Sequence, residues 1–98
     1  MYYNEYFFYL KEKLPGKCYD VLDECYNAHK KEVEASFAYF QNLEYGEICV
    51  ETKIIIPRIE SLTMAYEILI RENLIDVTED GRFRLDRFGV YLLHYLNK

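Results

Sequence analysis

Three arginines close to the C-terminus, Arg82, Arg84 and Arg87, are the residues whose type and spacing most suggest binding chemistry. If residues 82–85 form a strand, Arg82 and Arg84 share one exposed edge, because alternate side chains of a strand point the same way. A guanidinium offers a rigid fork of N–H donors that suits phosphate oxygens. The spacing therefore favours a phosphate contact, although a solvated hairpin with cross-strand pairs such as Glu79–Arg82 explains these charges almost as well.

Four polar residues upstream could extend this set of phosphate contacts, but two acidic neighbours weaken the case. The carboxylates of Glu60 and Glu67 would repel phosphate. The same surface could therefore equally meet a protein. The additional candidates are Lys53, Arg58, Ser61 and Arg71.

Catalytic residues are hard to assemble from this sequence. Its two histidines, His29 and His94, each stand among helix-forming residues, and spacing identifies no partner for either. The four glycines are scattered rather than gathered into a phosphate-binding loop. We therefore expect no enzyme activity and no cofactor.

The three cysteines, Cys18, Cys25 and Cys49, do not predict a metal site. Cys25 and His29 are four residues apart and could touch one ion, yet two ligands do not make a zinc site. On one helix, Cys18 and Cys25 would lie ~10.5 Å apart, too far for a disulfide. We expect free thiols that pack as small hydrophobic groups, with an intermolecular disulfide left open because the count is odd.

Length and composition indicate one small folded domain. The 98 residues are 51% hydrophobic and 30% charged, and eleven tyrosines and six phenylalanines supply large side chains for a thin core. The net charge of −5 disfavours indiscriminate attraction to nucleic acid or anionic membrane, but it leaves room for a local basic edge. Without an apolar run of about 18 residues, and without signal-peptide features at the start, the sequence predicts a cytoplasmic protein with no membrane partner.

Two helices are predicted in the first half of the chain. Residues 2–14 form the first, which a Pro-Gly pair ends. Residues 17–43 form the second, which would be ~40 Å long if unbroken, longer than so small a domain is wide. The second helix therefore either breaks near the polar run at 29–32 or projects and pairs with another copy. The apolar positions are Tyr3, Phe7, Leu10 and Leu14 in the first helix, and Cys18, Leu22, Cys25, His29, Val33, Phe37 and Phe40 in the second.

The aromatic residues of these helices also suit a symmetric dimer. Two-fold pairing is the commonest route to an oligomer, and large rings make good contacts between copies. We expect a homodimer that uses the region from residue 2 to residue 40. The residues assigned to this contact are Tyr3, Phe7, Leu10 and Leu22.

Residues 47–56 are open to two interpretations. β-Branched residues alternate along them as in a strand, but a short strand at 47–50 followed by one helical turn is also compatible. Pro57 suits the first position of a helix, which is predicted over 57–73 with one apolar side turned inward. The alternating residues are Ile48, Val50, Thr52, Ile54 and Ile56; the inward residues of the helix are Ile59, Leu62, Tyr66 and Leu69.

The C-terminal segment predicts a hairpin followed by a last helix. Asn73 suits the left-handed residue that ends a helix. Asp80-Gly81 predicts a two-residue turn in which both residues have positive φ. Asp86 can cap the last helix by accepting hydrogen bonds from its first N–H groups. The residues expected to face the core are Phe83 and Leu85 on the hairpin, and Phe88, Leu92 and Tyr95 on the helix.

The runs ENLIDV (72–77) and DGRFRLDRFGVYLL (80–93) resemble the winged-helix, or winged helix-turn-helix, family. Asn-Leu-Ile at 73–75 stands where the family usually has Gly-Leu-Ile, and Leu-Asp-Arg-Phe-Gly at 85–89 stands where it has Leu-Thr-x-x-Gly. Both replacements keep the physical role of the residue. The resemblance covers roughly residues 39–96, and the family places a second helix over 51–59, where the alternation indicates a strand.

This resemblance implies an α+β fold, mostly α, in one domain spanning residues 1–98. Residues 1–43 would form additional N-terminal helices, and residues 44–98 would form the winged-helix core with its C-terminal β-hairpin wing. The helix at 57–73 would enter a DNA major groove and the wing would touch neighbouring phosphates. The implied DNA-binding residues are Arg82, Arg84, Arg87, Arg58, Ser61, Arg71 and Lys53.

Two functions follow from the resemblance. The first is a homodimeric transcription regulator that binds double-stranded DNA. The second is a winged-helix module for protein recognition, such as a small acidic inhibitor or adaptor that binds a host protein without sequence-specific DNA binding. The net charge of −5 motivates the second. Small winged-helix proteins of similar composition are common among archaeal viruses and plasmids.

Overall fold

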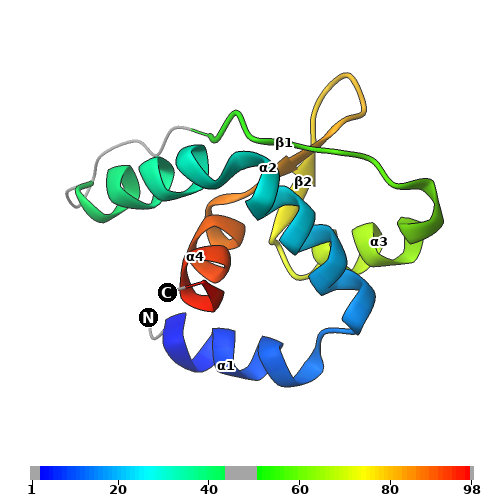
Figure 1. Cartoon of the computed structure of the whole chain (residues 1–98), viewed down its shortest axis with the longest axis horizontal. Helices are drawn as coiled ribbons and strands as arrows, with labels where there is room; N and C mark the ends of the chain where they lie inside the picture. Colours follow the sequence, from blue (N-terminus) through cyan, green and yellow to red (C-terminus); the bar gives the residue numbers. More distant parts are fainter. Residues whose placement is uncertain (1–2, 44–50, 98) are drawn as a thin grey trace.

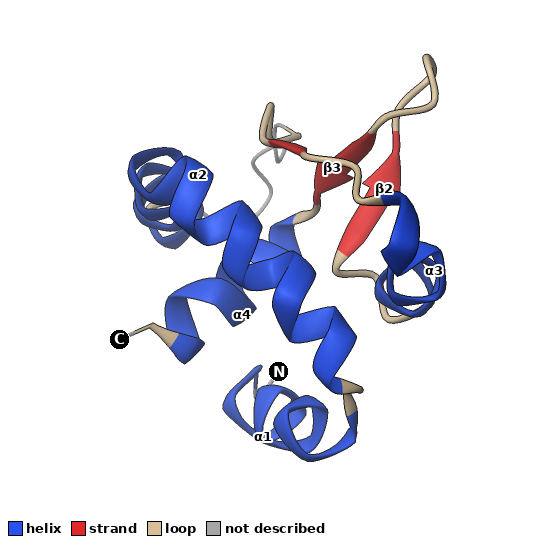
Figure 2. Ribbon diagram, turned by 45° about the vertical axis from the view of Figure 1, so that its right-hand side comes forward, coloured by secondary structure: helices blue, strands red, loops and turns tan. Residues whose placement is uncertain are grey.

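The computed structural model describes residues 3–43 and 51–97, which form a mostly helical α+β domain (Figures 1 and 2). The coarse fold class predicted from the sequence is therefore confirmed. Three short strands form one antiparallel sheet in the order β1-β3-β2. In both views the hairpin that joins β2 to β3 and the first helix lie at opposite ends of the molecule. The elements are α1 (Tyr3–Lys13), α2 (Gly16–Gln41), β1 (Ile55–Ile56), the 3-10 turn η1 (Glu60–Leu62), α3 (Thr63–Arg71), β2 (Ile75–Val77), β3 (Phe83–Leu85) and α4 (Arg87–Leu96).

Helix α1 packs its predicted apolar side against the rest of the same chain. Phe7 and Leu10 are 2% and 1% exposed, and Leu14 is also buried. The ring of Phe7 lies 5.8 Å from that of Tyr95 on α4. The hydroxyl of Tyr19 on α2 donates to the carbonyl oxygen of Leu10 at 3.0 Å, which fixes the corner between the two helices.

Helix α2 is bent at His29, where φ is −132° and ψ is 31°. His29 Nε2 donates to the carbonyl oxygen of Ile55 at 3.0 Å, so the bend brings the helix onto the first strand. Val33 and Phe40, beyond the bend, remain buried. The prediction of a break within the polar run at 29–32 is confirmed, and the alternative of one straight projecting helix is wrong.

The segment before β1 is extended, as the alternation predicted. Thr52, Ile54 and Ile56 are buried, whereas Lys53 between them is exposed. The Thr52 hydroxyl donates to the carbonyl oxygen of Leu85, so the segment is anchored on β3, the central strand of the sheet. The alternative helical turn before Pro57 is not formed. The part of this prediction that covers residues 47–50 lies outside the described residues.

Helix α3 is shorter than the predicted helix over 57–73. Residues 57–59 stay extended because the side chain of Tyr66 holds them. Its hydroxyl donates to the carbonyl oxygen of Pro57 at 2.8 Å and accepts from the backbone N–H of Ile59 at 2.7 Å. Residues 51–59, where the resemblance places a second helix, hold the extended segment and β1, and η1 then leads directly into α3.

The hairpin has a three-residue loop, and the predicted two-residue turn is wrong. Thr78 N–H donates to the carbonyl oxygen of Arg82 at 2.8 Å, and Gly81 N–H donates to that of Thr78 at 3.0 Å. Gly81 has a φ of 84°, whereas Asp80 does not adopt a positive φ. The Thr78 side chain explains the difference, because its hydroxyl donates to the Asp80 carboxylate and accepts from Arg82 N–H. Asn73 has the predicted left-handed conformation, with a φ of 63°.

The start of α4 packs closely on Leu74, in the connection between α3 and β2. Asp86 caps α4 as predicted, since its carboxylate accepts from Phe88 N–H. A Cβ atom on Gly89 would lie 2.2 Å from the carbonyl oxygen of Leu74, so this position requires glycine. Among the predicted core residues of α4, Leu92 is fully buried, but Phe88 and Tyr95 are only half-buried. The buried set instead comprises Gly89, Val90, Tyr91, Leu92 and Leu93.

Candidate functional site

Three of the predicted phosphate contacts meet in one groove beside the hairpin. Lys53 reaches it from the extended segment before β1, and Arg82 and Arg84 reach it from the hairpin. The groove has a volume of about 600 Å³ and is open to solvent. These three residues come together because β1 pairs with β3 in a register that sets Ile55 opposite Arg84.

Arg84 is not the exposed side chain that the alternation predicted. Only 19% of its side chain is exposed, and its Nε and Nη2 donate to the two carboxylate oxygens of Asp76 at 3.0 and 2.9 Å. Its Nη1 lies 3.1 Å from a carboxylate oxygen of Glu51. The hydrogen bonds with Asp76 hold the pKa of Arg84 above its usual value. This arginine ties the segment before β1 to the sheet and is engaged on both sides.

Arg82 remains at the surface, and its acidic partner is Asp80 rather than Glu79, the cross-strand partner considered from the sequence. Its Nε lies 2.9 Å from a carboxylate oxygen of Asp80, and both side chains are about 60% exposed. The hydrogen bond from Thr78, together with the charge of Arg82, holds the pKa of Asp80 below its usual value. Asp80 is therefore ionised at neutral pH, and a phosphate that binds Arg82 must compete with it.

The groove is polar but not positively charged overall. Three cations, Lys53, Arg82 and Arg84, stand against four carboxylates, so the formal charge of the cluster is −1. Lys53 has no ion-pair partner among the residues that the structure describes. Lys53 and Arg82 are thus the two cations whose ammonium or guanidinium group solvent reaches readily. The four carboxylates are those of Glu51, Asp76, Glu79 and Asp80.

Two other arginines predicted to contact DNA, Arg58 and Arg87, lie away from this groove. Arg58 sits over the ring of Phe83 at 5.6 Å, on the face of β3 opposite to Arg84. Arg87 is not part of the hairpin surface, since its Nε donates to the Tyr91 hydroxyl at 3.0 Å and its guanidinium lies 5.2 Å from the Phe40 ring centroid. Arg87 therefore joins α2 to α4.

The outer surface of η1 and α3 holds the other two predicted contacts. Ser61 and Arg71 are both exposed there, at opposite ends of the two elements. The same surface carries the exposed carboxylates of Glu60, just before Ser61, and of Glu67, and Met64 between these two acids is 66% exposed. Arg71 is thus the single cation of this surface between residues 60 and 71.

The residues assigned to a dimer contact are mostly part of the core of one chain. Phe7, Leu10 and Leu22 are at most 2% exposed, so a second copy could not reach them without unfolding the domain. The side chain of Tyr3 lies outside the described residues. The sequence reasoning missed the exposed aromatic side chains, Phe8, Tyr9 and Tyr39, which were available as the residues left over from the buried stripes.

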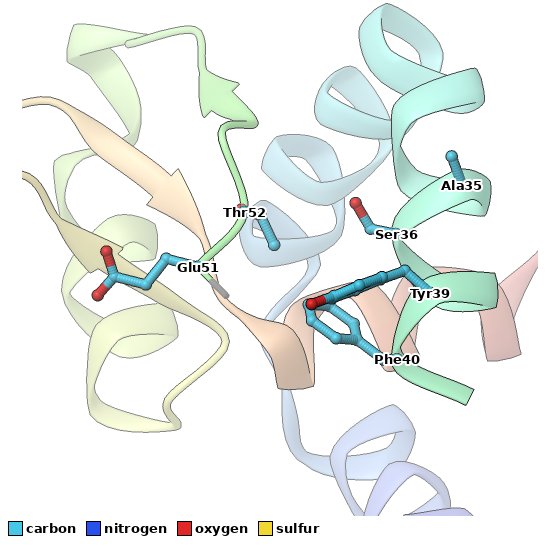
Figure 3. Close-up of a pocket in the computed structure, with 6 residues that line it drawn as sticks. All are labelled: Ala35, Ser36, Tyr39, Phe40, Glu51 and Thr52. Carbon is cyan, nitrogen blue, oxygen red and sulfur yellow. The ribbon is translucent and has the colours of Figure 1, made fainter. Parts of the chain in front are cut away.

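A second hollow, of about 370 Å³, lies between the end of α2 and the segment before β1 (Figure 3). The rings of Tyr39 and Phe40, whose centroids are 5.6 Å apart, form one wall. The polar groups on the other side are already engaged: Thr52 with the Leu85 carbonyl and Glu51 with Arg84. We therefore assign no ligand to this hollow.

Both histidines have partners that explain them without catalysis. His29 donates to the backbone of β1, as described above. His94 Nδ1 donates to a Glu34 carboxylate oxygen at 2.8 Å, and its ring stacks on Phe37 at 3.6 Å. The Tyr26 hydroxyl donates to the other oxygen of Glu34 at 3.1 Å. These contacts join the second half of α2 to α4.

The described cysteines are buried free thiols, as predicted. Cys18 and Cys25 are both 0% exposed, and burial raises the pKa of Cys25 to about 12. Cys49 lies outside the described residues. Within residues 3–43 and 51–97 no three His, Cys, Asp or Glu side chains are grouped so that they could hold a metal ion.

Comparison with known proteins adds no relative: no protein-family model, curated protein or solved structure matches this chain. None of the helices in the described part of the chain is long and apolar enough to cross a membrane.

Proposed function

We propose that this chain is a DNA-binding protein of winged-helix type that contacts phosphate through Lys53 and Arg82. The observation that carries the proposal is that these two exposed cations, far apart in the sequence, line one groove beside the hairpin. The hairpin itself protrudes from the domain (Figure 2). The order of helices, hairpin and capped last helix supports the same assignment. By the resemblance of residues 72–93 to that family, we propose transcription regulation as the role.

The charges of the groove limit the kind of binding that we propose. Asp80 and Glu79 flank Arg82, and Arg84 is held by Asp76 and Glu51. Two phosphate contacts release few counterions, so the binding is weak, independent of base sequence and moderately sensitive to salt. Dimerisation would strengthen such contacts, but it needs a surface other than Phe7, Leu10 and Leu22.

The test compares two double variants on a random DNA duplex. Lys53→Ala with Arg82→Ala removes both proposed contacts, so the slope of log affinity against log salt should become shallower by about 1.8, which is about 0.9 for each phosphate. Lys11→Ala with Lys13→Ala removes the same charge from exposed positions on α1, at the other end of the molecule, and should leave the slope unchanged. Fluorescence anisotropy at several salt concentrations measures both. Equal effects of the two variants would refute a contact at the hairpin.

Asp80→Asn provides a second test, in which DNA affinity is expected to rise rather than fall. The substitution removes the carboxylate that competes for Arg82 and keeps the side-chain oxygen that accepts from Thr78. DNA affinity should rise on the order of twofold to fivefold, the size of a surface ion pair. A fall in affinity on the same duplex would show that Arg82 does not face phosphate.

Protein recognition through η1 and α3 is the second candidate function. The exposed Met64 between two carboxylates favours it, because a methionine adapts to an apolar partner and the acids oppose DNA. Glu60→Gln with Glu67→Gln distinguishes the two cases. If this surface enters a DNA groove, the variant binds DNA more tightly than wild type; if it faces a protein, the DNA affinity does not change.

A further inference from the structure

Helix α1 carries a second stripe of large side chains that faces solvent. Phe8 is 60% exposed and Tyr9 is 53% exposed, although Phe7 next to them is buried. Glu5 and Glu12 are exposed on the same helix. Two neighbouring aromatic side chains left in water on a helix of eleven residues form an apolar patch of the kind that marks an interaction surface.

The spacing of these four residues makes them one surface. Glu5, Phe8, Tyr9 and Glu12 follow the pattern i, i+3, i+4 and i+7, which lies along one face of an α-helix. The two carboxylates are separated by ~10.5 Å along the helix axis, with the two rings between them. Among the described residues neither Glu5 nor Glu12 has an ion-pair partner. We call these four residues the outward stripe.

We propose that the outward stripe of α1 binds a basic amphipathic helix of a partner protein. A helix that presents lysine or arginine at positions i and i+7, and leucine-like residues at i+3 and i+4, matches it group for group. The cations meet Glu5 and Glu12, and the apolar side chains cover Phe8 and Tyr9. This is the helix-on-helix form of peptide recognition, with the charges setting the partner.

The charge pattern rules against the other obvious occupants. In a second copy of this chain, an antiparallel pairing sets Glu5 against Glu12 and a parallel pairing sets each acid against itself. Both arrangements place like charges opposite each other. The stripe itself also repels an anionic lipid surface and nucleic acid, because its only charges are the two carboxylates, and the exposed Lys11 and Lys13 lie to its sides rather than within it. The inference is independent of the function proposed for the hairpin, because α1 and the hairpin lie at opposite ends of the molecule (Figure 1) and no α1 residue lines that groove.

The test uses a synthetic fluorescent peptide, a helix with lysine at i and i+7 and leucine at i+3 and i+4, titrated with the full chain. Wild-type protein should bind it, and Phe8→Ser with Tyr9→Ser should weaken binding by at least about tenfold. Glu5→Gln with Glu12→Gln should weaken binding at low salt and flatten its salt dependence. All four side chains are exposed, so circular dichroism should show unchanged melting for both variants.

A matched control separates this stripe from general acidity. Asp20→Asn with Asp23→Asn removes two charges from exposed positions on α2 and should leave peptide affinity within about twofold of wild type. An equal loss in this control, or no binding by wild-type protein, would overturn the proposal. So would a wild-type dimer by light scattering that becomes monomeric when Phe8 and Tyr9 are replaced, because the occupant would then be a second copy. The Lys53→Ala, Arg82→Ala variant should bind the peptide normally, which keeps this test separate from that of the hairpin.

Discussion

The hairpin and α1, at opposite ends of the molecule, differ in whether their aromatic and charged side chains have partners within the fold. On the hairpin, Phe83 stacks on Tyr66 with ring centroids 4.5 Å apart, and Arg84 is held by two carboxylates. On α1, Phe8 and Tyr9 are exposed and the neighbouring glutamates have no ion-pair partner among the described residues. The end that is richest in arginine is therefore largely neutralised by its own carboxylates, whereas Glu5 and Glu12 on α1 keep their charges available, with Lys11 and Lys13 exposed on the same helix.

This contrast shows why the position of charged residues is a poor guide to what a surface attracts. A cation that donates to a local carboxylate offers little field to a ligand, since the pair is close to neutral. A carboxylate without a partner keeps its full charge toward an approaching molecule. In this protein the contacts within the fold decide which charges a partner can meet.

The largest expected effect separates the two faces of α1. Phe7→Ala should lower the free energy of unfolding by about 3–5 kcal/mol, because Phe7 is 2% exposed and its removal leaves a cavity. Phe8→Ala, one residue on, should change it by less than about 0.5 kcal/mol. Urea unfolding followed by circular dichroism measures both. Similar losses for the two variants would show that the outward stripe is buried in solution.

The next effect concerns the junction between the hairpin and α4. Gly89→Ala should destabilise the domain by about 3 kcal/mol, since the new Cβ would lie 2.2 Å from the Leu74 carbonyl oxygen and 2.5 Å from Leu85 Cδ1. Gly16→Ala is the control, because a Cβ there has no atom within 4 Å. The control should stay within about 0.5 kcal/mol of wild type in the same unfolding experiment. If Gly89→Ala is also neutral, the close approach of α4 to Leu74 is incorrect.

The smallest effect tests whether the two hairpin arginines differ as described. Arg84→Ala should cost about 1 kcal/mol of stability, because it breaks the two-pronged contact with Asp76. Arg84→Lys should not restore it, since an ammonium group lacks the planar fork. Arg82→Ala should leave the melting temperature unchanged. Equal melting temperatures for all three variants would mean that the contact of Arg84 with Asp76 does not stabilise the fold. Arg84 would then be a candidate for phosphate contact together with Arg82.

Much of the fold was predictable because it depends on neighbours in the sequence. The left-handed residue at Asn73, the glycine at the turn and the cap at Asp86 reflect backbone preferences of single residues. The extended segment with Thr52, Ile54 and Ile56 inward follows from side-chain alternation. The loop length of the hairpin was mispredicted because the hydroxyl of Thr78 bonds to Asp80 within the loop and to the N–H of Arg82 at its far end, and the Asp80-Gly81 pair alone does not indicate these contacts.

The candidate site was predictable only in part. Sequence spacing placed Arg82 and Arg84 on one edge of a strand, and the structure keeps them beside one groove with Lys53. Spacing could not reveal that Glu51 would reach Arg84, or that Arg87 would turn to Tyr91 and Phe40. Each of these partners comes from another element, so pairing depends on how the elements pack.

By itself, the sequence determined most of the helices and strands and the apolar side of α1 and of the segment before β1, since these follow from backbone conformation and side-chain periodicity along a few residues. Only the tertiary structure decided what those faces meet. It packed Phe7 into the core of the same chain rather than against a second copy, bent α2 at His29 to reach the Ile55 carbonyl, and gave Arg84 its two carboxylates. The physical reason is that burial and charge pairing are fixed by atoms brought together from distant parts of the chain.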